Sequence, residues 1–296
     1  MSSRLRQLWD DLRRHDSVLW RRAVDAGVTH GPRAFVRYSP PLFGLAFAAA
    51  LPRQRRAVEK NLRLALGPRP RLRELTQVAG LFANYAGSLT DAFVAGSERG
   101  DPLTVRCPDE KAIEDAVAAG KGMIIATAHT GGWQLAGLRL QSLHGREMMV
   151  VMRPERDARA QALSDAARAR AGVRVAQLGD DPLGVLELLG HLRRGGVVAM
   201  QMDRLPQGMR GRTSELFGEP FLVPEGPLRL AAASGAPIVP VFTRRLAYME
   251  YEVSVAPPIR LPRRPTPADL DAAARAVLQA METFVRENPT QWFHFE

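Results

Sequence analysis

The feature that most limits the possible folds is a regular alternation that begins near residue 105. From there on, short apolar runs rich in Val and Ile are separated by Ala-rich stretches long enough to form helices. The runs that we expect to be strands are 122–128, 146–152, 173–177, 196–202, 237–243 and 251–255. The stretches that we expect to be helices are 133–143, 156–170, 183–194, 225–234 and 267–286. This pattern predicts an α/β fold with a largely parallel sheet flanked by helices.

The first hundred residues lack this alternation and have the period of helices instead. The first expected helix carries one apolar face, made of Leu5, Leu8, Trp9 and Leu12, and its other face is rich in arginine. Further apolar stripes of helical period continue to about residue 94. We therefore expect an N-terminal helical layer over residues 1–104 and an α/β core over residues 105–296, joined in one compact unit.

The positive charge of the chain is concentrated in this first part. The 296 residues carry a formal net charge of +10, with 46% hydrophobic and 24% charged residues, which is the composition of a globular protein with a sizeable core. Residues 1–75 hold 16 basic and 6 acidic side chains, and the rest of the chain holds 25 of each. A basic segment of this kind can face anionic lipid, nucleic acid or an acidic carrier protein, or can simply reflect a high usage of arginine.

Several classes of protein are disfavoured by what the sequence lacks. The longest uncharged stretches are 38–52, 122–138 and 230–243, and all are shorter than the roughly 20 apolar residues that a spanning helix needs. The first residues do not resemble a secretory signal, so we expect a cytoplasmic protein. Cys107 is the single cysteine, and no Cys or His spacing suggests zinc. We predict neither a metal nor another cofactor.

The strand expected at 122–128 runs directly into the sequence His-Thr-Gly-Gly-Trp-Gln, which spans residues 129–134. Ligands of open α/β sheets enter at the carboxyl ends of the strands, so His129 would be placed where a substrate can reach it. The following Gly131 and Gly132 precede a helix start, where backbone N–H groups can bind an anion. An alternative is that the histidine caps a turn and that the glycines mark only a tight turn.

Two other strand ends bring charged side chains to the same edge of the predicted sheet. Asp203 and Arg204 follow the run 196–202, and Arg153 follows the run 146–152. An imidazole with a carboxylate and two guanidinium groups suits general-base attack on an ester or thioester of a phosphorylated substrate. The alternative for Arg153 and Asp203 is a structural ion pair.

Five segments in this order carry a resemblance to a known family. They are AHTGGWQLAG at 128–137, Arg153-Pro154, Met202-Asp203-Arg204, LFGEPFLVPEGPLRLAAASGAPIVPVFTRR at 216–245 and NPTQWFHFE at 288–296. Together they resemble the lipid A biosynthesis and phosphatidylinositol mannoside acyltransferase branch of the lysophospholipid (glycerolipid) acyltransferase superfamily. The resemblance covers roughly residues 30–296. It implies acyl transfer from acyl-carrier protein or acyl-CoA to a hydroxyl or amine of a lipid or glycolipid.

The resemblance also implies roles for individual residues. His129 would be the general base, and the turn formed by Thr130, Gly131, Gly132 and Trp133 would bind substrate and stabilise the oxyanion. Arg153 and Arg204 would hold phosphate or carboxylate groups of the substrate. The resemblance further implies a peripheral protein on the cytoplasmic side of the inner membrane, with the basic helical layer facing anionic lipid.

One position departs from the family pattern, in which the histidine is followed by four residues and then by Asp or Glu. Here that position is Gln134, whose amide can hold the imidazole but carries no charge to stabilise its protonated form. Three explanations stay open. Asp203 supplies the charge, or the protein is a weak or non-catalytic relative, or the glutamine is an engineered replacement of glutamate. Accordingly, His129, Gln134 and Asp203 are our candidate catalytic residues.

A second motif invites a different assignment. Pro224-Glu225-Gly226 resembles the phosphate-binding Pro-Glu-Gly of glycerol-phosphate acyltransferases, but in this chain the place of that motif belongs to residues 201–204. We interpret it as the opening of the helix expected at 225–234, with Glu225 favoured by the helix dipole. Trp292 and Phe293 are assigned no role.

The sequence thus predicts an acyltransferase, and one rival function stays open. In the rival, the same cleft binds an acyl lipid or an acyl carrier without turnover, because the usual acid is missing. Binding to nucleic acid is disfavoured, since no recognised motif and no interleaving of aromatic and basic residues supports it.

Overall fold

The computed structural model describes residues 18–118, 120, 122–135, 137, 147–152, 161–162, 165–166, 174–177 and 183–296. The predicted basic helix near residues 4–14 and the candidate Arg153 lie outside the described residues. So do most of the two helices expected at 133–143 and 156–170.

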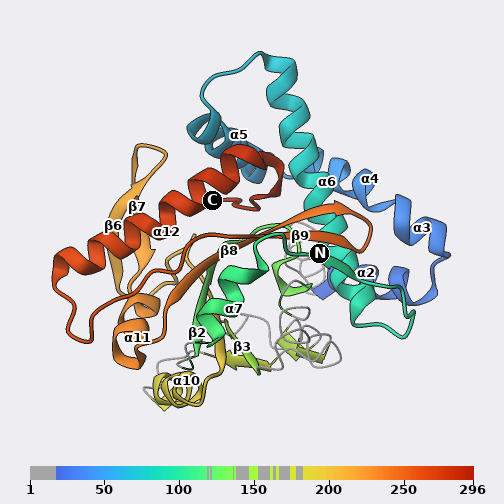
Figure 1. The fold of residues 1–296 in the computed structure, drawn as a ribbon. Coiled ribbons are helices and arrows are strands. Elements are labelled where there is room, and N and C mark those ends of the chain that lie inside the picture. The colour runs from blue at the N-terminus through green and yellow to red at the C-terminus, as the bar shows by residue number, and fades with distance from the viewer. Residues whose placement is uncertain are drawn as a thin grey trace, which may run out of the picture.

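Among the described residues, seven strands form one sheet in the order β1-β9-β8-β2-β5-β3-β4 (Figure 1). Their bounds are β1 Thr104–Arg106, β2 Met123–Thr127, β3 Met148–Met152, β4 Arg174–Gln177, β5 Val197–Gln201, β8 Ile238–Ala247 and β9 Glu250–Val255. Neighbouring strands are parallel except for the antiparallel pair β8 and β9. The predicted α/β fold with a largely parallel sheet is therefore confirmed.

Helices cover both faces of this sheet because the side chains of its central strand alternate in direction. Ile124 and Ala126 of β2 pack toward α10 (Leu183–Arg193), α11 (Gly226–Ser234) and α12 (Pro267–Glu287). Met123 and Ile125 pack toward α7 (Glu110–Ala118) on the opposite face. The sheet core is thus apolar on both sides, as expected for strands rich in Val, Ile and Met.

A layer of helices precedes the sheet in the chain. Its elements are α2 Val18–His30, α3 Arg33–Tyr38, α4 Pro40–Ala50, α5 Pro52–Leu66 and α6 Arg71–Ala95. Helices α4 and α6 cross closely at Gly44, where an added Cβ would lie 2.4 Å from the carbonyl oxygen of Phe82. None of the helices in the described part of the chain is long and apolar enough to cross a membrane.

A buried carboxylate joins α6 to the sheet. Asp91 is fully buried and accepts hydrogen bonds from Arg245 Nε at 2.7 Å, from the Tyr251 hydroxyl at 2.6 Å and from the Met249 N–H at 3.2 Å. Burial and the neighbouring carboxylate hold the pKa of Tyr251 well above its usual range. Helix α6 is therefore fixed to β8 and β9 by a charged pair that is shielded from water.

The structure also contains elements that the sequence pattern did not predict. Strand β1 is short and lies at the sheet edge, α7 is a nine-residue amphipathic helix, and β6 (Gly211–Leu216) forms a hairpin with β7 (Glu219–Pro224). Figure 1 shows this hairpin alongside α12, apart from the main sheet. Because the side chains of β6 alternate between exposed and half-buried up to the buried Leu216, its sequence lacks the apolar run that marks a core strand.

The elements that were predicted agree in type with the observed ones where they are described. The strand bounds agree within two residues except at β8, which extends to Ala247 because Arg244 is balanced by Glu252 on β9, with 2.7 Å between their charged groups. The predicted start of a helix at Pro224-Glu225-Gly226 is confirmed, since α11 begins at Gly226. The carboxylate of Glu225 forms ion pairs with Arg229 at 2.7 Å and Arg212 at 3.4 Å.

We predict that Asp91→Asn lowers the free energy of unfolding by about 3 to 5 kcal/mol, because the largely buried Arg245 would lose its counter-charge. The control is Asp115→Asn, which removes an exposed ion pair with Lys111 and should cost less than about 0.5 kcal/mol. Urea unfolding followed by circular dichroism measures both. Equal stability losses in the two variants would contradict this account of the junction.

Candidate active site

The pairing of β2 with β5 brings the two principal candidates together. Thr127 at the end of β2 lies opposite Gln201 at the end of β5, in a parallel register. His129 and Asp203 each stand two residues beyond these strand ends. Parallel neighbours of equal register must therefore present this imidazole and this carboxylate side by side.

The imidazole and the carboxylate form a direct hydrogen bond. His129 Nδ1 lies 2.8 Å from Asp203 Oδ1, and the backbone N–H of His129 donates to Oδ2 at 3.1 Å. An ionised carboxylate only accepts hydrogen bonds, so Nδ1 must be the donor. The second ring nitrogen, Nε2, is left with a lone pair, and the His129 side chain is 28% exposed. This arrangement suits a general base.

Asp203 is held in its charged form although it is fully buried. Burial has the largest effect and would raise the pKa of the carboxyl group, but the attraction to the His129 ring, the hydrogen bonds from His129 and the nearby His294 together hold that pKa well below its usual range. The carboxylate therefore keeps its negative charge beside the imidazole.

The C-terminal segment, which we define as Trp292–Glu296, completes this site. Trp292 Nε1 donates to Asp203 Oδ2 at 3.1 Å, and the Phe293 N–H donates to the carbonyl oxygen of His129 at 2.7 Å. His294 stacks on Trp292 with 4.9 Å between ring centroids, and its Nδ1 lies 3.8 Å from Asp203 Oδ2. Sequence reasoning missed these contacts, although a cluster of aromatic and histidine side chains at the end of the resemblance was a visible signal.

The turn after His129 is built by close packing. Thr130 is buried, and its hydroxyl accepts a hydrogen bond from the Thr243 N–H at 3.2 Å. Gly132 has φ +65°, and a Cβ there would lie 2.0 Å from Tyr251 Cε1, while a Cβ on Gly131 would lie 2.3 Å from Gln291 Oε1. Both glycines are thus required by space, and Gly132 also by its left-handed backbone.

Gln134 is the third candidate catalytic residue. It lies with the half-buried Trp133 in the helical turn that follows the glycines. No hydrogen bond joins the described side chains of Gln134 and His129, whose ring instead contacts Asp203. The structure therefore brings His129 and Asp203 together and leaves Gln134 out of the pair.

Arg204 reaches the same site but contacts the protein itself. Its Nη2 donates to the Phe293 carbonyl oxygen at 3.1 Å, and its Nη1 lies 3.7 Å from the carboxylate of Glu296. Its Nε is buried and has no hydrogen-bond partner among the described residues. Arg204 thus supports the C-terminal segment and retains capacity for another acceptor.

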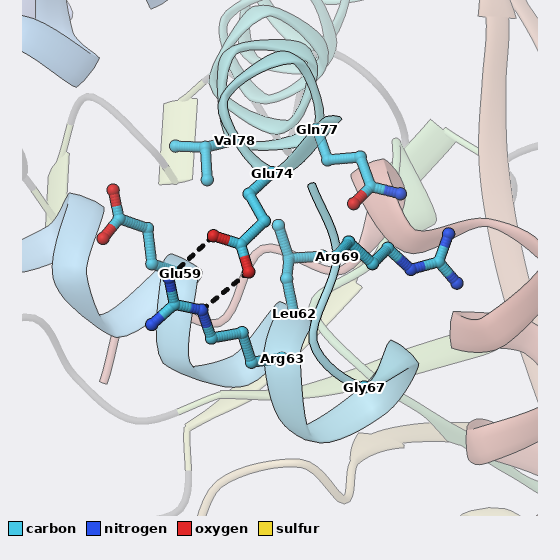
Figure 2. Close-up of a pocket in the computed structure, with 8 residues that line it drawn as sticks. All are labelled: Glu59, Leu62, Arg63, Gly67, Arg69, Glu74, Gln77 and Val78. Atoms are coloured by element: carbon cyan, nitrogen blue, oxygen red, sulfur yellow. Dashed lines mark hydrogen bonds and ion pairs between the residues drawn. The ribbon is translucent and has the colours of Figure 1, made fainter. Parts of the chain in front are cut away.

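A small hollow of about 10 Å³ between α5 and α6 is lined by none of the predicted site residues. Figure 2 shows Glu74 directed toward Arg63, which donates to both carboxylate oxygens at 2.8 and 2.7 Å. These hydrogen bonds lower the pKa of Glu74 to about 2. We interpret this hollow as part of the turn between α5 and α6, which the ion pair of Arg63 and Glu74 stabilises.

No group of three or more potential metal ligands occurs in the described part of the chain.

Comparison with known proteins identifies the family. The model of the bacterial lipid A biosynthesis acyltransferases matches residues 23–296. This chain belongs to that family, which confirms the resemblance stated from the sequence.

Individual relatives match over a shorter part. Phosphatidylinositol mannoside acyltransferase of Mycobacterium tuberculosis strain H37Rv is 31% identical over 128 residues, and that of strain CDC 1551 is 33% identical over 129 residues. Each match spans 43% of this chain and 40% of the relative. A crystal structure of the 1-acyl-sn-glycerophosphate (LPA) acyltransferase from Thermotoga maritima aligns with 83% of this chain and 95% of its own, with a TM-score of 0.37 and 12% identity.

The lowered pKa of Asp203 predicts how stability responds to acid. A carboxyl group whose pKa is lower in the folded than in the unfolded chain stabilises the fold above its unfolded pKa, about 3.9, and loses this contribution as the pH falls further. The wild type should therefore lose stability relative to Asp203→Asn as the pH falls below about 4. Urea unfolding of both proteins between about pH 3 and pH 6 measures the difference, and a gap that is independent of pH would contradict the prediction.

Proposed function

We propose that this chain transfers a fatty acyl group from an acyl thioester, carried by acyl-carrier protein or coenzyme A, to a hydroxyl or amine of a lipid or glycolipid. The observation that carries the proposal is the hydrogen-bonded pair of His129 and Asp203 at adjoining strand ends, in a chain that belongs to an acyltransferase family.

The proposed reaction follows from the free Nε2 of His129. This nitrogen removes the proton of the acceptor group while the acceptor oxygen or nitrogen bonds to the thioester carbonyl carbon. The tetrahedral intermediate then breaks its carbon–sulfur bond. The departing thiolate takes the proton from the imidazolium, so the products are an acylated acceptor and a free thiol.

We assign Asp203 the task that an acid after the histidine performs in the family pattern. Its carboxylate lies 2.8 Å from the ring and would stabilise the imidazolium that forms during attack. This geometry supports the first of the three explanations for Gln134, in which another residue supplies the charge.

The oxyanion of the intermediate needs hydrogen-bond donors near His129. The Thr130 N–H already donates to the Ala128 carbonyl oxygen at 2.7 Å. We therefore propose the later N–H groups of the turn, those of Gly132 and Trp133, as the donors. Arg204 and Arg153 remain our proposed ligands for a phosphate or carboxylate of the substrate.

The acceptor that we would test first is a glycolipid. The curated relatives are named for phosphatidylinositol mannoside, and the family for lipid A biosynthesis. A phosphatidylinositol mannoside joins a sugar to a lipid, so we propose a sugar hydroxyl of a membrane glycolipid, reached from the cytoplasmic side of the inner membrane.

The function is tested by thiol release and by mass spectrometry of the acylated lipid. We expect wild-type protein to release thiol from acyl-CoA or acyl-carrier protein in the presence of acceptor. His129→Ala should lose this activity by at least about 10³-fold, because it removes the base, and should still bind both substrates. Substrate binding without thiol release in the wild type would instead favour the rival function, an acyl-binding protein.

Two further variants decide which residue supplies the charge. Asp203→Asn should lower kcat by about 10² to 10⁴-fold, since a neutral amide can neither favour the imidazolium nor fix its tautomer. Gln134→Glu should change kcat by less than about threefold, because Gln134 has no bond to the imidazole. If Gln134→Glu greatly raised turnover while Asp203→Asn did not lower it, the assignment of Asp203 would be wrong.

We also propose that the helical layer binds an anionic membrane. Residues 26–58 contain five arginines and no acidic residue. Helices α3 and α4 expose large apolar side chains, namely Phe35, Tyr38, Leu42, Phe43 and Leu45. A surface that combines arginine with exposed aromatic and aliphatic groups suits the lipid headgroup region.

Vesicle sedimentation tests this surface. Binding should be stronger to anionic than to neutral vesicles and should weaken as salt rises, because the Debye length falls from about 10 Å at 0.1 M to about 3 Å at 1 M. Leu42→Asp should weaken binding, and the matched control Leu222→Asp, which changes an exposed leucine on β7, should not. Equal binding of the wild type to neutral and anionic vesicles would contradict an electrostatic contribution to membrane binding.

A further inference from the structure

The buried carboxylate of Asp203 faces two imidazoles. His129 Nδ1 lies 2.8 Å from Oδ1, and His294 Nδ1 lies 3.8 Å from Oδ2. The second oxygen already accepts hydrogen bonds from the His129 N–H and from Trp292 Nε1. His294 therefore lies within range of the electrostatic attraction of the carboxylate but is too far from it for a hydrogen bond.

The position of His294 is fixed by ring stacking and by its backbone carbonyl. The ring stacks on Trp292 at an interplanar angle of 22°, and its side chain is 11% exposed. Its backbone carbonyl accepts a hydrogen bond from Asn61 Nδ2 on α5 at 3.0 Å. Within the described part of the chain, its buried Nδ1 has no hydrogen-bond partner. Packing thus holds an unsatisfied imidazole nitrogen beside the charged carboxylate.

Other charged groups surround this imidazole. Arg204 contacts the carbonyl of Phe293, the residue before His294, and the carboxylate of Glu296 follows two residues later. His129 faces Asp203 from the end of β2. The groups that act on His294 are therefore the negative Asp203 and Glu296 and the positive Arg204, together with His129 when it is protonated.

We propose that His294 is a positioning residue that acts on His129 through Asp203, an inference that rests on the proposed function. When His294 is protonated, it shares the single negative charge of Asp203 with His129. Because one carboxylate balances only one imidazolium, a proton on His294 disfavours a proton on His129. His129 would then stay a free base to a lower pH than it would with Asp203 alone.

The direction of this coupling follows from the charges. Two imidazolium groups on opposite oxygens of one carboxylate repel each other. Replacing His294 by a neutral residue should therefore let His129 accept a proton more readily. The same change should move the acid limb of the kcat/KM profile to higher pH.

The test compares the wild type with His294→Gln, which keeps hydrogen-bonding capacity but cannot be charged. The control is His30→Gln, which removes an exposed histidine on α2. The ring titrations of the six histidines are followed by NMR on the full chain labelled at histidine, and the acid limb of kcat/KM is measured in parallel. We expect the His129 titration and the acid limb to move together to higher pH in His294→Gln and to stay in place in His30→Gln.

Different results separate the inference from the proposed function. A uniform loss of activity at every pH with an unchanged His129 titration would assign His294 a purely structural role and overturn the inference. Lack of turnover in the wild type would contradict the proposed function, and the NMR titration would still test the coupling of the two rings. If His294→Gln failed to fold, the histidine titration curves of the wild type alone would test the inference. Two-step coupled curves for His129 and His294 would support the inference, and independent single-step curves would overturn it.

Discussion

The site depends on one buried negative charge. A carboxylate removed from water is strongly destabilising unless hydrogen bonds and an opposite charge compensate it. Asp203 obtains this compensation from two residues that are far from it in the chain, namely from the ring and backbone N–H of His129 and from the indole of Trp292. The same hydrogen bonds that stabilise the buried charge also orient the imidazole and hold the C-terminal segment against the strand ends.

A second buried carboxylate, Asp91, connects the helical layer to the site. Its partner Arg245 donates a backbone N–H to Gln291 Oε1 at 3.0 Å, and Gln291 lies against Gly131 in the turn after His129. On the other side, Tyr251 bonds to Asp91 through its hydroxyl and leaves room for Gly132 but for no larger residue. The turn that we assign to the oxyanion is therefore shaped by contacts that begin in α6.

The sheet and the placement of His129 and Asp203 could be predicted from the sequence, because both depend on local patterns in the chain. Short apolar runs identified the strands, and parallel strands bring their carboxyl ends together, so His129 and Asp203 could be expected at one edge. The sequence could not decide between Asp203 and Gln134 as the partner of the imidazole, because that choice depends on the register of β2 with β5. The contacts of Trp292 and His294 could not be predicted either, since a contact across 89 residues leaves no periodic trace. The hairpin β6–β7 was missed because it lies outside the sheet core.

The central claim is that Asp203 holds His129 with its Nδ1 protonated and its Nε2 free. Long-range proton–nitrogen NMR correlation on histidine-labelled protein measures the tautomer of His129 directly, at a pH where the ring is neutral. The account predicts the Nδ1–H tautomer in the wild type and its loss in Asp203→Asn. A wild-type ring that carries its proton on Nε2 would contradict the account, because that nitrogen could then accept no proton from a substrate.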